Sequence, residues 1–305
     1  MSGWTTPITW GTATVTVAQM NEQVRDNMNY LNNLNPQAYF AGGRLTPTSG
    51  NPYGTGDVSD VSTVYYTPAV GNRIALYDGA SAWDIITFPE GTIDVTALTA
   101  SKPYDVFMYS NGGTATLETL VWTNATTRAT GLSYQDGVLV KTGATTRRFL
   151  GAVYVDAGTL TQDSVTKRYI TNYYNTISKN LYVNTVSENT IGTIVPALWD
   201  ASETGNRLDF FIPGPHGDYA EIGLVSRSKS GVDGQYARTQ IHLDTAEYTT
   251  PGINVSTYVD QYIKLADRAP AKIETGYHYI NAYIQGTNGG TATFIEMRLN
   301  VQVRI

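Results

Sequence analysis

Apolar and polar residues alternate strictly near the C-terminal end of the chain. From residue 295 to 305, every second residue is apolar and each residue between is polar or charged. A period of two predicts a β-strand with one buried face. The apolar positions are Ile295, Met297, Leu299, Val301, Val303 and Ile305. The same alternation recurs at 277–285, where Ile280, Ala282 and Ile284 form the expected buried face and the tyrosines lie on the other.

A different period marks the start of the chain. Thr16 and Gln19 have the spacing of a capping box, in which each side chain bonds a backbone N–H group of the other. Apolar residues then recur at steps of three and four, which predicts a helix over about 17–33. Asn35-Pro36 would end it, because the residue before proline disfavours helical backbone. Such a helix must bury its stripe within the chain, on copies of itself or on a partner.

Short strands separated by turns are expected over the rest of the chain. In 41–175, apolar runs stand between Asn-Gly and Asp-Gly turns, the residues that two-residue hairpins need. In 176–305 the strands are longer and suit a two-sheet jelly roll. We therefore predict an all-β fold: two β-sandwich domains, 41–175 and a jelly-roll-like 176–305, behind an N-terminal segment, 1–40, that contains one short α-helical anchor. The runs expected as strands in 41–175 are 64–66, 73–77, 82–88, 104–109, 115–122, 138–140 and 149–155.

Composition agrees with this pattern. Charged residues make up 15% of the 305, while the chain holds 43 Thr, 29 Gly and 22 Tyr. Thr and Tyr favour half-buried pleated surfaces, and Gly favours turns. The net charge of −6 and the absence of a basic stripe argue against a nucleic-acid partner. With no Cys, disulfides and thiolate sites are excluded. No apolar run is long enough for a membrane-spanning helix, and no signal peptide is expected.

The residues that could do chemistry are few. His216, His242 and His278 lack metal-ligand spacing, although a weak metal site at His216 and Asp218 stays open. No nucleophile-elbow or phosphate-loop motif occurs. A glycosidase needs only two carboxylates about 5–10 Å apart, and no pair stands out. We expect no catalytic residues, no metal and no cofactor, and hence not an enzyme.

Binding has more support than catalysis. Tyrosine gives a large contact area at low entropy cost, so Tyr236, Tyr277, Tyr279 and Tyr283 are candidate ligand-binding residues. The alternative is that they pack under the other sheet or in a subunit interface. Two Trp within the first ten residues suit docking onto another protein, or packing on the first domain. The run 167–175, which is basic and aromatic, is expected to be a packed connector between domains.

The order of several short motifs resembles that of tailed-bacteriophage virion proteins. In residues 20–31, MNEQVRDNMNYL fits their N-terminal pattern of Met-Asn-x-x-x-Arg-Asp-Asn-x-x-x-Leu. Further shared motifs are GNRIALYDG at 71–79, QDGVLVK at 135–141, TRRFLG at 146–151 and KRY at 167–169. The resemblance covers about residues 4–175, whereas 176–305 resembles no family that we can name.

This resemblance implies a fibre-like structural component of a virion, assembled in the host cytoplasm and commonly a homotrimer. Its N-terminal segment would bind other virion proteins, and its C-terminal domain would attach to a glycan or protein of the host surface. The alternatives are a head fibre, decoration or neck protein without host binding, or a polysaccharide-degrading tip. No membrane insertion is implied. The expected virion-anchoring residues are Trp4, Trp10, Met20, Val24, Arg25, Asp26, Met28 and Leu31.

Overall fold

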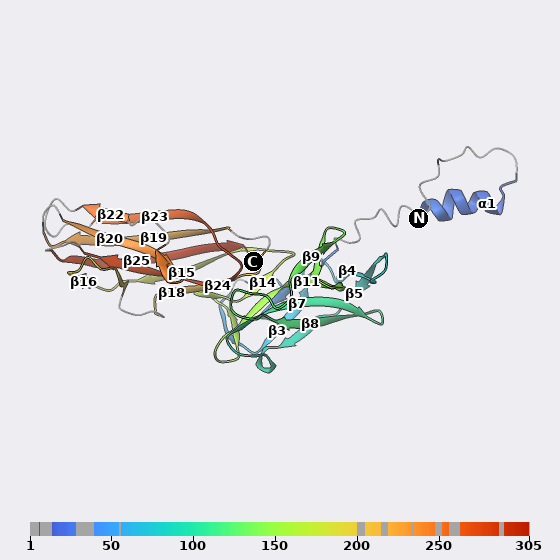
Figure 1. Cartoon of the computed structure of the whole chain (residues 1–305), viewed down its shortest axis with the longest axis horizontal. Coiled ribbons are helices and arrows are strands. Elements are labelled where there is room, and N and C mark those ends of the chain that lie inside the picture. The colour runs from blue at the N-terminus through green and yellow to red at the C-terminus, as the bar shows by residue number, and fades with distance from the viewer. Residues whose placement is uncertain are drawn as a thin grey trace.

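The fold is mostly β, as the sequence predicts (Figure 1). A computed structural model describes residues 6, 14–28, 40–54, 56–199, 205–214, 219–232, 235–247, 252–255, 263–286 and 290–304. In this part of the chain the strands form two bodies that lie next to each other, and the N-terminal helix stands apart from both (Figure 1). Within the described residues, the pairing is antiparallel except where β13 meets β18.

The N-terminal helix begins as the capping box predicts. It consists of α1 (Val17–Met20) and a π-helical continuation (Asn21–Asp26), and residues 27–28 are also helical. The Thr16 hydroxyl accepts from the Gln19 amide at 3.2 Å, and the Gln19 side chain accepts from the Thr16 amide at 3.0 Å. The expected end near residue 33 lies outside the described residues.

The first body follows the expected strands closely. A large sheet runs β8 (Thr114–Val121), β7 (Lys102–Asn111), β11 (Ala144–Val155), β10 (Val138–Lys141) and β9 (Leu132–Gln135), with β14 (Ile170–Asn172) also paired to β11. A smaller sheet joins β1 (Gly43–Thr46), β3 (Thr63–Pro68) and β6 (Gly91–Asp94), and the last forms from β4 (Arg73–Tyr77) and β5 (Trp83–Thr87). A 3₁₀ turn, Val95–Ala97, follows β6. Leu45, Val64, Ile74, Val106 and Val153 belong to the core between them.

The second body is a sandwich of two sheets. One contains β15 (Ser178–Thr185), β25 (Ala292–Arg304), β19 (Tyr219–Ser230) and β23 (Ile263–Lys272), with β16 (Asn189–Ile191) on β25. The other contains β18 (Arg207–Ile212), β24 (Gly276–Gln285), β20 (Tyr236–Leu243), β21 (Ala246–Glu247), β17 (Ala197–Leu198) and β22 (Gly252–Val255). Phe210, Ile222, Ile280 and Leu299 are buried between these sheets.

The sheet that contains β18 continues past the expected domain boundary at 175. On its other side it takes in β13 (Lys167–Arg168), β12 (Thr161–Asp163) and β2 (Val58–Val61). The parallel pairing of β13 with β18 sets Lys167 beside Asp209 and Arg168 beside Phe210. Trp122 and Phe211 also meet edge-to-face, with ring centroids 5.2 Å apart. The segments 41–175 and 176–305 therefore share both a sheet and buried apolar contacts.

The alternation predicted for the last strand is correct except at its start. Met297, Leu299, Val301 and Val303 are fully buried in β25. Ile295 was expected beside them, but Phe294 is buried in its place and Ile295 is only half-buried. A β-bulge explains the correction: Arg227 pairs with Glu296 and Ser228 with Phe294, so Ile295 has no partner on β19 and the phase shifts by one residue. Ile305 lies outside the described residues.

Candidate ligand-binding pocket

The tyrosines of β24 lie on the face that the sequence predicts. Ile280, Ala282 and Ile284 are buried in the sandwich core, while Tyr277, Tyr279 and Tyr283 alternate with them and are half-buried. These tyrosines do not form one cluster. Tyr283 stacks on His242 of β20, with ring centroids 3.7 Å apart, while Tyr277 lies at the other end of β24. Tyr236 begins β20, but its side chain lies outside the described part of the structure.

Tyr277 contacts the first body through an aromatic cluster. Its ring stacks on Tyr154 of β11, with centroids 4.5 Å apart and planes inclined by 18°. Tyr169, which follows β13, meets Tyr154 edge-to-face at 5.0 Å and Tyr277 at 6.1 Å. The cluster thus joins β11, the connector and β24. The tyrosine face expected to bind a ligand is, at this end, also a contact between the two bodies.

A pocket of about 290 Å³ opens beside this cluster. Its walls come from the turn before β7, the end of β11 with the turn that follows, the connector and the second body. The lining residues are Ser101, Tyr154, Asp156, Ala157, Gly158, Lys167, Tyr169, Arg207 and Tyr277. Of these residues, the sequence patterns indicated only Tyr277 as a binding residue. The pocket combines aromatic surface, hydroxyl groups and charge, which is typical of sites for small polar ligands.

Arg207 and Asp209 form a closed charged unit at one wall. The Arg207 guanidinium lies 3.0 Å from Asp209 Oδ1, and its Nη2 donates to the Tyr277 hydroxyl at 3.2 Å. The Tyr277 hydroxyl in turn donates to the Asp209 carboxylate. Arg207 also lies over the Tyr279 ring, 4.6 Å from its centroid. The buried carboxylate and the guanidinium therefore satisfy each other.

The tyrosine hydroxyls of the pocket keep their protons. Burial, followed by the negative charge of Asp209, raises the pKa of Tyr154, Tyr169 and Tyr277 above its ordinary value. These phenols are hydrogen-bond donors and not anions throughout the physiological pH range.

The other wall of the pocket carries Lys167, whose ammonium group is not paired with a carboxylate among the described residues. Lys167 points to the same side of the sheet as Asp209, its neighbour across the parallel pair. Within the described part of the chain, its ammonium group makes no hydrogen bond or ion pair. Asp156, the nearby acid, is turned back into its own turn, where Oδ1 accepts from the amides of Gly158 at 2.8 Å and Leu160 at 3.0 Å.

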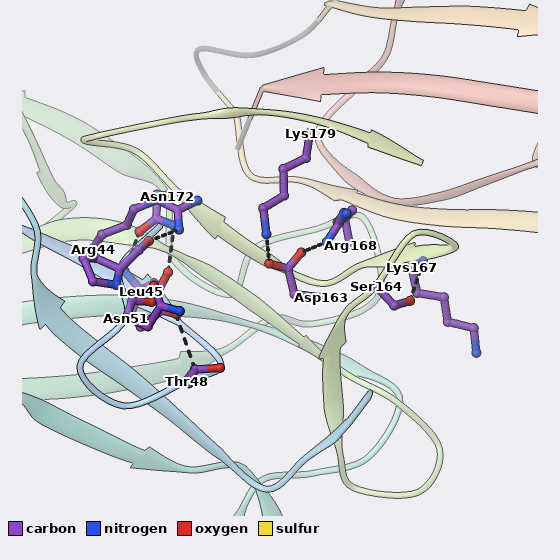
Figure 2. Close-up of polar contacts among 12 residues, drawn as sticks. Arg44, Leu45, Thr48, Asn51, Asp163, Ser164, Lys167, Arg168, Asn172 and Lys179 are labelled. Atoms are coloured by element: carbon purple, nitrogen blue, oxygen red, sulfur yellow. Dashed lines mark hydrogen bonds and ion pairs between the residues drawn. The ribbon is translucent and has the colours of Figure 1, made fainter. Parts of the chain in front are cut away.

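A buried ion cluster fixes the connector that supplies Lys167 and Tyr169. Asp163 of β12 accepts from Arg168 of β13 at 2.5 Å and from Lys179 of β15 (Figure 2). All three side chains are buried. In Figure 2, Arg168 points toward Asp163 while Lys167 extends away from the cluster. Arg44, also buried, donates to the carbonyls of Pro52 and Asn175. The run 167–175 is thus a packed connector, as expected.

A second pocket of about 650 Å³ lies on the first body. It is lined by Phe40, Gly42, Val70, Tyr174 and their neighbours, so its walls are largely apolar side chains and backbone. No residue of the predicted sites lies there.

Of the predicted anchoring residues that the structure describes, Asp26 is half-buried and the others are solvent-exposed: Met20, Val24, Arg25 and Met28. Met28 is 63% exposed, and Val17, which lies on the same stripe, is 78% exposed. Arg25 pairs with Asp26 at 2.9 Å on the same helix. Trp4, Trp10 and Leu31 lie outside the described residues. The helical stripe therefore has no apolar cover in the part of the chain that the structure describes.

The histidines and acids do not gather into a metal site where the structure describes them. Among the described residues, no group of three or more His, Asp or Glu side chains could hold a metal ion; His216 and Asp218 lie outside them. His278 instead contacts Asp244 at 3.0 Å and the Glu274 carbonyl at 2.8 Å. None of the helices described is long and apolar enough to cross a membrane.

Comparison with known proteins found no matching family model and no similar curated protein. Solved structures give distant matches. Eiger TNF from S. frugiperda is 9% identical with a TM-score of 0.29, over 43% of this chain and 92% of that chain. The C-terminal domain of EclA, described as a sugar-binding protein, is 8% identical with a TM-score of 0.22, over 38% and 78%. The insecticidal δ-endotoxin Cry8Ea1 from Bacillus thuringiensis is 8% identical with a TM-score of 0.26, over 84% and 51%. At these values the likenesses define neither a family nor a function.

The sequence did not indicate several of the pocket residues as binding residues. Tyr154, Tyr169, Lys167 and Arg207 belong to segments that pairing between distant strands brings together. Ser101 could have been suspected only from its position in a turn just before a strand. The high tyrosine content of the chain indicated a tyrosine-rich binding surface, and the alternation in β24 identified Tyr277, one residue of the aromatic cluster.

Proposed function

We propose that the protein is a fibre-like structural component of a bacteriophage virion. Its N-terminal helix attaches it to other virion proteins, and its second β body presents a binding surface to a glycan or protein of the host. We expect the assembled protein to be a homotrimer without enzymatic activity. The observation that carries the proposal is the exposed apolar stripe of the N-terminal helix, which stands apart from both β bodies (Figure 1).

The stripe supports attachment by a physical argument. Burying an exposed Val or Met side chain contributes roughly 1.5–3 kcal/mol, and such side chains seldom remain exposed together unless a partner covers them. Val17, Met20, Val24 and Met28 lie at helical spacing. They match the segment in which the sequence resembles phage virion proteins. A partner helix or groove of the virion would cover them.

The pocket supports attachment to a host surface. Aromatic rings, phenol hydroxyls and charged groups converge on a cavity where the second body meets the first. Tyrosine-rich surfaces suit sugar rings, which have apolar C–H faces and a polar rim. A trimer would display three such sites, and multivalency would convert weak individual contacts into strong attachment.

A second function rests on a different observation. Tyr277 stacks on Tyr154 across the two bodies, which is also what a purely structural junction would require. A head fibre, decoration or neck protein that strengthens the particle without touching a host would show the same contact. Host binding by the purified protein distinguishes the two functions.

Incorporation into particles tests the anchor. Particles assembled with Val24→Asp and Met28→Asp together should lack the protein, because two charges would enter the buried contact. Glu22→Gln, on an exposed polar position of the same helix, is the matched control and should be incorporated normally. Normal incorporation of the double variant, with the protein folded by circular dichroism, would show that this stripe is not the anchor.

Cell binding tests attachment. Fluorescently labelled full-length protein should bind host cells and should be displaced by excess unlabelled protein. If the labelled protein does not bind and particles without it are fragile, the structural alternative is correct.

A further inference from the structure

We propose that the pocket beside Tyr277 binds a single sugar unit that carries an anionic group, and that the Lys167 ammonium is the partner of that group. This inference rests on the proposed function of glycan attachment and specifies its ligand. The polar groups around the pocket divide into those that already have partners and those that do not.

The size of the pocket limits the ligand. At about 290 Å³ it lies at the lower end of the range for small-molecule sites. One sugar ring with a substituent suits this volume, whereas an oligosaccharide would have to extend out of it. The ligand would therefore be a terminal or side-branch sugar of a larger glycan.

The walls supply the contacts that a sugar needs. Tyr154 and Tyr277 stack on each other and both line the pocket, so the ring surface that this stack leaves uncovered can contact the apolar C–H face of a pyranose. Their hydroxyls remain protonated, because burial raises the pKa of both phenols. The Tyr277 hydroxyl already donates its proton to Asp209, so the Tyr154 hydroxyl is the one of the two that can donate a hydrogen bond to the ligand.

The charges determine which sugar is preferred. Asp209 neutralises Arg207, and the Asp156 carboxylate accepts two backbone amides. Lys167 lines the pocket and has no partner in the described structure. A free ammonium beside aromatic walls favours an anion, since a charge-assisted hydrogen bond is roughly twice as strong as a neutral one. A uronic acid or a similar carboxylated sugar fits this arrangement, and a cationic sugar does not.

Ser101 provides a second free group at the rim. Its backbone has φ of +57°, a conformation that glycine adopts at lower cost than serine. The Ser101 amide donates to the Asp156 carbonyl at 3.1 Å, so the turn itself is made by the backbone. The hydroxyl has no partner in the described structure and lies at the pocket. A serine in this conformation suits a role for the hydroxyl in binding.

Ligand-observed NMR with two monosaccharides tests the inference on the full-length protein. The probes are D-glucuronate and its neutral parent D-glucose. We expect saturation transfer to glucuronate that weakens as salt rises, and much weaker transfer to glucose. Lys167→Gln should reduce glucuronate affinity roughly tenfold or more, and Ser101→Gly should reduce it by a smaller factor. Lys141→Gln removes the same charge from an ion pair with Glu118 outside the pocket and should leave affinity unchanged.

The outcomes separate this inference from the proposed function. If neither monosaccharide binds the pocket while labelled protein still binds host cells, the ligand assignment is overturned and attachment stands. Equal binding of glucose and glucuronate, or glucuronate binding that Lys167→Gln does not weaken, also overturns it. If glucuronate binds with the expected loss in Lys167→Gln but cells are not bound, the pocket assignment holds and the host-attachment function fails.

Discussion

Replacing the buried Asp163 by Asn should destabilise the protein strongly. Asp163 is the acid between Arg168 and Lys179, and all three are buried (Figure 2). The amide keeps the shape of the side chain and removes its charge. Two buried cations, Arg168 and Lys179, then lose their anion. Burial lowers the pKa of Arg44 and the negative charge of Asp163 opposes that shift, so Arg44 also loses a favourable interaction. Breaking a buried pair in this way costs about 3–5 kcal/mol.

Deprotonation of Lys179 limits that cost. Burial already lowers the pKa of Lys179, and Asp163 opposes the shift. Without Asp163 this pKa falls further, so the lysine can become neutral in the folded protein. A group whose pKa is lower in the folded state than in the unfolded state releases its proton on folding, so stability rises with pH. The destabilisation of Asp163→Asn should therefore be largest near neutral pH and smaller toward pH 9.

Urea unfolding followed by tryptophan fluorescence measures the effect. A loss of 3–5 kcal/mol corresponds to a fall in the midpoint of about 1–2 M. The control is Asp84→Asn, at an exposed position, which should change stability by less than about 0.5 kcal/mol. In a double-mutant cycle, Lys179→Met should cost much less in the Asp163→Asn background than in the wild type. If Asp163→Asn behaves like Asp84→Asn, the cluster does not hold the connector and the reasoning is wrong.

Two further predictions concern the first body. Burial, opposed by Arg128, raises the pKa of Asp105 to about 6, so Asp105 binds its proton more tightly when folded. Stability from this group should rise by about 3 kcal/mol as pH falls from about 7 to about 3, and a carboxyl NMR titration that places its midpoint near 4 would refute this. Gly151→Ala should lower the melting temperature strongly, because the added methyl would overlap the Thr171 carbonyl oxygen. Gly56→Ala, where a methyl meets nothing within 4 Å, should melt like the wild type.

Patterns that involve neighbours in sequence predicted the fold well. The alternation in β24 placed Ile280 and Tyr277 on opposite faces, because adjacent residues of a strand always diverge. The capping box placed the start of the helix for the same local reason. Ile295 was predicted wrongly because a bulge depends on the partner strand, and no periodicity within one strand can show it.

The pocket could be predicted only in part, since its residues meet through long-range pairing. Tyr277 was identified from a tyrosine-rich strand. Lys167 and Arg207 are forty residues apart in the sequence and become neighbours because β13 pairs in parallel with β18. A pairing of so few residues leaves almost no pattern in the sequence. The basic and aromatic run 167–175 was predicted to be a packed connector, which gave no reason to expect a binding residue within it.

The short strand β13 carries both a residue of the buried ion cluster and the proposed binding residue of the pocket. Neighbouring residues of a strand point to opposite faces. Arg168 points into the buried cluster with Asp163, and Lys167 points away from it (Figure 2). The Lys167 side chain lines the pocket instead. The cluster thus fixes the backbone from which the Lys167 side chain extends into the pocket. The Lys167 side chain itself makes no contact in the cluster. Changes at Asp163 should alter both stability and binding, whereas changes at Lys167 should alter binding alone. If Asp163 variants lose both stability and binding while Lys167 variants lose binding alone, Lys167 belongs to a binding site that the buried cluster positions. If Lys167 variants bind normally, Lys167 is a surface charge that lies near the junction.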